Sequence, residues 1–194
     1  MIFLLLALAT LGACMNYSDY LGRNICLPLS AALYSHKPSS CLRKRINASE
    51  VQNFTATLEG GSCSGLIVTL PKNKTVALTF RADLKDPHTD DSWDKFYFPL
   101  KMWLYGGNVS SFLANGFKEL WENKRMRDEF QKTIASGIDK VLITGHYVGG
   151  ALATLVAHDI VADNRAENKD VTVITLGQMM VGDEEFAKAY EEQV

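Results

Sequence analysis

The second half of the chain alternates between two spacings of apolar residues. Segments 140–144 and 171–176 are nearly continuous apolar runs, typical of parallel strands that are buried on both faces. Segments 150–161 and 183–191 follow these runs and are predicted to be helices. This strand-helix-strand-helix order predicts an α/β fold with a mostly parallel sheet and flanking helices.

The first half predicts further elements. Segments 64–70 and 75–80 are β-rich and are separated by turn residues, which predicts a hairpin. Apolar residues recur at three-to-four spacing across 112–134, so we expect one or two amphipathic helices whose aromatic stripe lies in the core. A helix is also expected over 24–34 and is predicted to end at Pro38.

The segment 83–107 has no regular spacing. It mixes acidic and aromatic side chains, among them Asp86, Asp90, Trp93 and Phe96. Long segments of this composition are often lids or binding loops. We therefore expect it to lie near a ligand site.

Composition narrows the class of protein. The 194 residues carry 20 Lys and Arg against 22 Asp and Glu, so the formal net charge is −2 and nucleic acid is not expected as a partner. A hydrophobic content of 47% argues against disorder. Beyond the N-terminus no apolar run reaches the roughly 18 residues of a transmembrane helix. No repeat or linker divides the chain, which predicts one domain.

The N-terminus predicts a secreted protein. An apolar block at 2–9 is followed by small residues, so we interpret 1–14 as a signal peptide and 15–194 as the domain. A buried N-terminal helix and a lipoprotein box that would lipidate Cys14 are the alternatives.

The number of N-glycosylation sequons supports an extracellular location. Ten Asn and 24 Ser and Thr predict about 1.2 sequons by chance, whereas five occur. They begin at Asn16, Asn47, Asn53, Asn73 and Asn108, and we expect glycans at the last four because Asn16 lies close to the cleavage site.

All four cysteines lie in the first third of the chain. Cys26, Cys41 and Cys63 are disulfide candidates, with Cys14 as a fourth if it is retained. Three connectivities are then open, and removal of Cys14 would leave an odd thiol. The spacing of Cys and His does not match a zinc site, so no metal is expected.

The main chemical signal is the junction between the strand at 140–144 and the following helix. It reads Gly145-His146-Tyr147-Val148-Gly149, followed by Gly150. Glycines on both sides relieve crowding where a strand turns sharply into a helix, which is the pattern G-x-S-x-G of a nucleophile elbow. Tyr147 stands where that pattern has Ser.

With this junction the chain resembles the lipase class 3 family of α/β-hydrolases, within it the secreted branch with N-terminal cysteines. Matching segments lie at 29–41, 75–81, 107–121, the elbow and 177–183, the last reading GQMMVGD where the family usually has G-Q-P-R-x-G-[DN]. The resemblance covers most of the mature chain. It implies an α/β-hydrolase fold, here incomplete at its C-terminal side, and a lipid-related function without a cofactor.

The resemblance also implies the roles that two positions have lost. Active members use Ser, Asp and His in that chain order, with an oxyanion hole formed by the amide after the Ser and by a Ser or Thr after Phe-Arg-Gly. Tyr147 replaces the nucleophile, Val148 supplies the following amide, and Asp83 replaces the second donor. A carboxylate about 4 Å from the oxyanion would oppose it by up to about 4 kcal/mol.

The remaining acid and base positions are not matched either. Only 47 residues follow Tyr147, whereas the family places its Asp and His farther on. We expect His146 to be structural, His158 and Asp159 to be surface or satisfied polar residues, and Asp183 to cap the last helix. His36 and His88 fit no pattern.

These observations predict a secreted, catalytically inactive relative of class 3 lipases that contacts lipid or an acyl chain through its aromatic segment. A tyrosine ring that plugs the cleft would remove that ligand site. An active triacylglycerol lipase or other carboxylic ester hydrolase, and a non-enzymatic interaction module or unproductive fragment, are the alternatives. The strand at 171–176 reads as an interior strand, so we expect a protein partner or a second chain to cover its far edge.

Overall fold

A computed structural model describes residues 17–85 and 97–194. The predicted signal peptide at 1–14, Cys14, Asn16, His88 and the acidic part of the 83–107 segment lie outside these ranges. In the described part of the chain no helix is both long and apolar enough to cross a membrane.

A five-stranded mixed sheet forms the centre of the molecule, in the order β1-β2-β3-β6-β7. The antiparallel part consists of β1 (Glu50–Leu58), β2 (Gly61–Leu70) and β3 (Thr75–Leu84). β6 (Lys140–His146) joins β3 in parallel, and β7 (Asp170–Leu176) joins β6 in parallel. β7 is therefore an edge strand.

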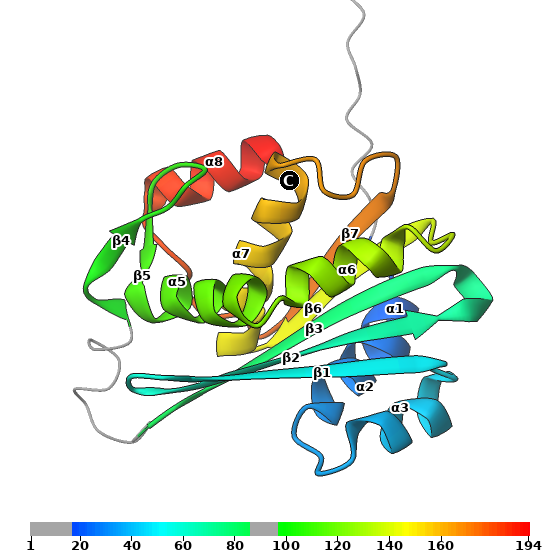
Figure 1. The fold of residues 1–194 in the computed structure, drawn as a ribbon. Coiled ribbons are helices and arrows are strands. Elements are labelled where there is room, and N and C mark those ends of the chain that lie inside the picture. The colour runs from blue at the N-terminus through cyan, green and yellow to red at the C-terminus, as the bar shows by residue number, and fades with distance from the viewer. Residues whose placement is uncertain (1–16, 86–96) are drawn as a thin grey trace, which may run out of the picture.

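Helices cover both faces of this sheet (Figure 1). One face carries α1 (Asp19–Leu21), a π-helical turn (Gly22–Cys26), α2 (Leu27–Ala32) and α3 (Pro38–Ile46). The other face carries α5 (Ser111–Phe117), a π-helical turn (Lys118–Asn123), α6 (Met126–Ile134), α7 (Val148–Ala162) and α8 (Glu184–Gln193). The result is a three-layer α/β architecture.

Alternation along the strands divides the core into two clusters. Ile67 and Leu78 are buried with α5, α6 and α7, whereas Leu66 and Ala77 are buried with α2 and α3. Neighbouring strand residues point to opposite faces, so each strand supplies both clusters. This explains why the strand sequences are almost continuously apolar.

A short hairpin lies outside the main sheet, beside α8. β4 (Leu100–Met102) and β5 (Asn108–Ser110) pair antiparallel, and Trp103 in the connecting turn is buried. Val109 forms a bridge to Gly182. The segment expected to be a loop thus contains a packed hairpin.

Most predicted elements are confirmed, but α1, α3, β1 and the β4–β5 hairpin were missed. The hairpin, the helices across 112–134 and the β6-α7-β7-α8 order are present. α3 was missed because it buries only Leu42, and β1 because its edge position leaves most of its side chains exposed or half-buried. The prediction that Pro38 ends a helix was wrong, because the preceding helix ends at Ala32 and Pro38 begins α3.

Candidate functional site

The turn from β6 into α7 is strained and tightly packed. Tyr147 has φ 58° and ψ −116°, a conformation that side-chain-bearing residues rarely adopt. A Cβ on Gly145 would lie 2.3 Å from the carbonyl oxygen of Gly149, and a Cβ on Gly149 would lie 2.2 Å from the carbonyl oxygen of Phe80. Both positions therefore require glycine, while Gly150 has slightly more room, with 3.2 Å to the Gly145 carbonyl oxygen.

Backbone hydrogen bonds hold Tyr147 in this conformation. Its N–H donates to the carbonyl of Leu176 at 2.9 Å, and its own carbonyl accepts from Gly150 at 3.1 Å and from Met179 at 3.4 Å. The side chain is 41% exposed at the carboxyl end of β6. Val148 is buried as the first residue of α7. The elbow thus holds a partly exposed tyrosine on a fixed backbone.

Asp83 lies near the end of β3 and is paired with Arg81. The Nε and an Nη of Arg81 lie 2.9 and 2.8 Å from Asp83 Oδ1. Arg81 also donates to the carbonyl of Leu33 at 3.0 Å. The carboxylate therefore has an adjacent compensating charge, which weakens the repulsion expected from the sequence.

A polar contact ties the start of the chain to the elbow. The Arg81 guanidinium stacks 4.2 Å from the ring centre of Tyr34, and Tyr34 Oη lies 3.0 Å from His146 Nδ1. Burial raises the pKa of Tyr34, so its hydroxyl stays protonated. His146 is thus held by a hydrogen bond. Tyr34 was missed as a site residue, although it lies in the 29–41 segment of the resemblance.

The sequence predicts that His158 is either a surface residue or a polar residue whose hydrogen bonds are satisfied. The structure shows the second of these, in a buried position. His158 is fully buried, and Trp103 Nε1 donates to its Nδ1 at 3.2 Å. Its Nε2 lies 3.1 Å from Gln193 Oε1. Desolvation lowers the pKa of His158. The hairpin, α7 and α8 therefore meet at this ring.

Asp159 is also buried and is a structural acceptor. It accepts from Tyr105 Oη at 2.9 Å, from Trp121 Nε1 at 2.8 Å and from Arg165 Nε at 2.7 Å. A surface position is wrong for both residues because the hairpin and α8 cover this part of α7. Their sequence neighbours gave no signal, since the partners are 35 to 55 positions away for all contacts except that of Arg165.

Asp183 caps α8, as predicted. It accepts from the Phe186 N–H at 2.9 Å, and from the N–H and Nδ2 of Asn108 at 3.0 and 2.8 Å. The hydrogen bonds from Asn108 lower the pKa of this carboxyl. Asp183 is therefore engaged in structure rather than aimed at the elbow.

The candidate modification sites differ in accessibility. Asn47, Asn53 and Asn73 are exposed, whereas Asn108 is half-buried and its side-chain amide is bonded to Asp183. The Asn108 sequon thus competes with the cap of α8.

The three described cysteines are free thiols in this structure. Cys26 and Cys63 are buried in the two different core clusters, whereas Cys41 is exposed. Burial raises the pKa of Cys26 to about 11 and that of Cys63 to about 12. A bridge between Cys26 and Cys63 would have to cross the sheet, so this geometry does not support that pairing.

Three large apolar side chains in and around the elbow segments are exposed, and we call Tyr147, Met180 and Phe98 the apolar rim. Met180 is 62% and Phe98 is 54% exposed. Met179, the neighbour of Met180, bonds to Tyr147, and Tyr97, the neighbour of Phe98, donates to the carbonyl of Gly182 at 3.0 Å. Met180 therefore follows a residue bonded to the elbow, and Phe98 follows a residue bonded to the segment after Met180.

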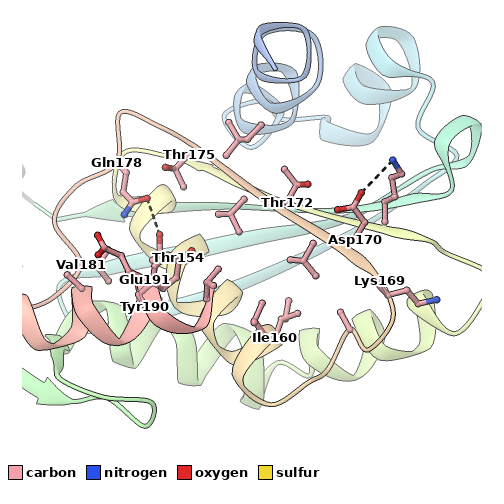
Figure 2. Close-up of a pocket in the computed structure, with 18 of the residues that line it drawn as sticks. Thr154, Ile160, Lys169, Asp170, Thr172, Thr175, Gln178, Val181, Tyr190 and Glu191 are labelled. Carbon is pink, nitrogen blue, oxygen red and sulfur yellow. Dashed lines mark hydrogen bonds and ion pairs between the residues drawn. The ribbon is translucent and has the colours of Figure 1, made fainter. Parts of the chain in front are cut away.

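A trough of about 1280 Å³ follows the open edge of β7 (Figure 2). Thr172 and Thr175 of β7, Ile160 of α7 and Tyr190 of α8 line it. Thr154 donates to Gln178 at 3.0 Å at one end, and Lys140 pairs with Asp170 at the other. The expected open edge at 171–176 is thus present, bordered by helices on both faces.

Residues 17–85 and 97–194 contain no group of three or more His, Cys, Asp or Glu side chains that could hold a metal ion.

Comparisons with known proteins identify similar sequences. The model of the family "Lipase (class 3)" matches residues 73–194. Lipase ZK262.3 of Caenorhabditis elegans is 29% identical over 175 residues, covering 87% of this chain and 48% of its own. Phospholipase A(1) DAD1, chloroplastic, of Arabidopsis thaliana is 34% identical over 99 residues, covering 46% of this chain and 22% of its own.

A solved lipase supports the fold. The structure of the lipase from Rhizopus microsporus var. chinensis superposes with a TM-score of 0.69 at 22% identity, covering 89% of this chain and 61% of that chain. The architecture is that of an α/β-hydrolase. The chain spans about half the length of the worm lipase that it matches. Because the family model matches well over half of its residues, the chain belongs to the lipase class 3 family.

Proposed function

We propose that this chain is a secreted lipase class 3-like protein of lipid metabolism that has lost ester hydrolysis and keeps a lipid contact at the apolar rim. The observation that carries the proposal is Tyr147 at the strained elbow position. The phenolic oxygen extends a ring length beyond the place of a serine oxygen and ionises near pH 10. It cannot meet a carbonyl carbon beside the amides at the start of α7.

The position of Asp83 adds a second defect. An oxyanion hole needs a hydrogen-bond donor, and a carboxylate held by Arg81 offers only acceptor oxygens. Since Arg81 compensates the charge, we assign the defect chiefly to the missing donor. Restoring Ser at 147 alone should therefore not restore full hydrolysis.

The apolar rim supports a retained lipid contact. Clusters of exposed apolar side chains mark interaction surfaces, and two members of this set, Tyr147 and Met180, lie at the elbow and next to the Met179 that bonds to it. The names of the worm and plant relatives, a lipase and a phospholipase A(1), agree with a lipid ligand for this chain.

Hydrolysis tests the proposed inactivity. The chain, its Tyr147→Ser variant and a Tyr147→Ser variant with Ala82→Gly and Asp83→Thr are assayed on short- and long-chain p-nitrophenyl esters. We expect the unchanged chain to be inert, because loss of a nucleophile costs on the order of 10⁶-fold in a serine hydrolase. Turnover by the unchanged chain, or its labelling by a serine-reactive phosphonate, favours the active-hydrolase alternative.

Flotation with phosphatidylcholine vesicles tests the lipid contact. Met180→Asp should weaken binding several-fold, because a charge at the rim must be desolvated on contact with lipid. Leu104→Asp is the matched control, since Leu104 is 80% exposed on the β4–β5 connection, away from the rim. Equal effects of both variants, or no binding by the unchanged chain, would contradict a lipid contact at the rim.

Glycan mapping of the chain expressed through a secretory pathway tests its location. We expect glycans on Asn47, Asn53 and Asn73 and an unmodified Asn108, whose amide bonds to Asp183. Retention of an unmodified chain inside the cell would contradict secretion, and a fully occupied Asn108 would show that the cap of α8 forms without that bond.

A further inference from the structure

The strongest feature outside the elbow is the buried ring of His158. It lies between four aromatic rings, with centroids 5.1 Å from Tyr105, 5.4 Å from Tyr190, 5.7 Å from Phe186 and 6.4 Å from Trp103. These rings come from the β4–β5 hairpin and from α8. One imidazole on α7 thus joins two elements that are distant in sequence.

The hydrogen bonds around this ring fix its protonation state. The Trp103 indole can only donate, so His158 Nδ1 must accept, and the proton of the neutral ring lies on Nε2. That proton is donated to Gln193 Oε1. The amide orientation is fixed independently, because Gln193 Nε2 donates to the carbonyl of Tyr105 at 3.2 Å. A closed circuit therefore runs from the hairpin through His158 and Gln193 back to the hairpin.

This circuit accepts only the neutral imidazole. A proton on Nδ1 would face the Trp103 N–H, so two donors would oppose each other in a site without solvent. The titratable side chains that face His158 are Tyr105 from the hairpin, Asp159 from α7 and Tyr190 from α8. Burial raises the pKa of both tyrosines, so they stay neutral, and the Asp159 carboxylate is held by Arg165, Trp121 and Tyr105.

We propose that His158 is a pH-sensitive latch that fastens α8 and the β4–β5 hairpin to α7 at neutral pH and releases them in acid. Release moves Tyr190 and Glu191, which line the trough beside β7 (Figure 2). Acidification would therefore widen the trough. The proposal is independent of whether the elbow hydrolyses esters.

The direction of the pH dependence follows from linkage. Desolvation lowers the pKa of His158 in the closed state, whereas a released His158 titrates near its ordinary value of about 6.5. The latch is fully closed above that value and weakens as the pH falls below it, because the released state binds more protons. If the closed state stays unprotonated, the open population rises about 30-fold between pH 7.5 and pH 5.0.

Hydrogen–deuterium exchange of the full chain, corrected for the intrinsic effect of pH on exchange, measures this opening. Exchange in α8 and in the hairpin should rise up to about 30-fold between pH 7.5 and pH 5.0. His158→Gln should abolish that rise, because Gln can accept from Trp103 and donate to Gln193 but does not titrate. His36→Gln, which alters an exposed histidine, is the matched control and should keep the rise. The latch proposal is overturned if exchange in the unchanged chain does not depend on pH, or if exchange in His158→Gln rises as much as in the unchanged chain.

A second variant keeps the test decisive if His158→Gln does not fold. Gln193→Glu places a carboxylate opposite His158 Nε2, which favours the imidazolium in the closed state. The rise in exchange should then flatten or reverse. An unchanged slope in this variant also overturns the proposal.

Discussion

β6 and β7 are neighbouring parallel strands of equal length and similar sequence, yet their surroundings differ. They pair along their whole length, from Lys140 opposite Asp170 to His146 opposite Leu176. In β6, between two strands, residues 141–145 are buried, whereas in β7, at the sheet edge, residues 171–176 are only half-buried. An apolar β-branched run therefore predicts a strand and its pairing, but the number of neighbours decides how much the strand stabilises the fold.

The difference in burial between β6 and β7 also separates the elbow from the trough. The elbow grows out of the buried strand, where close contacts of Gly145 and Gly149 hold the strained Tyr147. The trough lies along the edge strand β7, where no sixth strand among the described residues covers the backbone groups and apolar side chains. The first region is fixed by close backbone contacts, and the second is an uncovered, half-buried edge.

The largest expected effect comes from equal truncations in the two strands. Ile143→Ala should lower the free energy of unfolding by about 4 kcal/mol, because Ile143 is fully buried and its removal leaves a cavity. Ile174→Ala should cost about 1.5 kcal/mol, because its half-buried site can collapse or admit water. Urea denaturation measures both. Equal losses would mean that β7 is covered in solution.

The packing of the elbow gives the next effect. Gly149→Ala should lower the free energy of unfolding by about 3 kcal/mol, because the new Cβ would collide with backbone atoms of Phe80 and Arg81. Gly137→Ala is the control: its φ is 88° but nothing lies within 4 Å of the new Cβ, so about 1 kcal/mol is expected. A tolerated Gly149→Ala would remove the packing explanation of the G-x-Y-x-G spacing.

The sequence predicted what depends on local pattern. The parallel β6 and β7, the α7 and α8 helices and the cap at Asp183 follow from spacing and end signals. The elbow could be located from the sequence because the tight turn leaves no room for a Cβ at Gly145 or Gly149. These are features that a few consecutive residues determine.

The sequence could not predict what depends on distant partners. Whether Asp83 faces the elbow depends on Arg81 and Tyr34, and the burial of His158 depends on Trp103 and Gln193. Each side chain by itself is compatible with a surface position. Only the folded arrangement pairs the charge of Asp83 and removes His158 from water.

Relief of strain at the elbow should give a smaller effect of opposite sign. Tyr147→Gly should raise the free energy of unfolding by about 1 kcal/mol, because glycine adopts a positive φ without the cost that Tyr147 bears. His146→Gly, one residue earlier in β6, should lower it by about 1 kcal/mol through lost strand propensity and the lost contact with Tyr34. Calorimetry on both variants measures these changes in the free energy of unfolding. Destabilisation by Tyr147→Gly would show that the aromatic ring stabilises the fold by more than the backbone strain costs.

The smallest effect on stability, and the most direct test of the open edge, comes from a charge on β7. Thr172→Lys should change the free energy of unfolding by about 0.5 kcal/mol or less, since the long side chain can reach solvent from a half-buried edge position. It should nevertheless reduce self-association in sedimentation velocity, because lysine on an edge strand opposes pairing with another chain. Thr57→Lys on β1, the opposite edge, is the matched control and should have little effect, because that edge is already lined with exposed polar side chains. A chain that stays monomeric without any substitution would show that the helices beside β7 shield its edge, and the contrast between the two strands would then be one of burial alone.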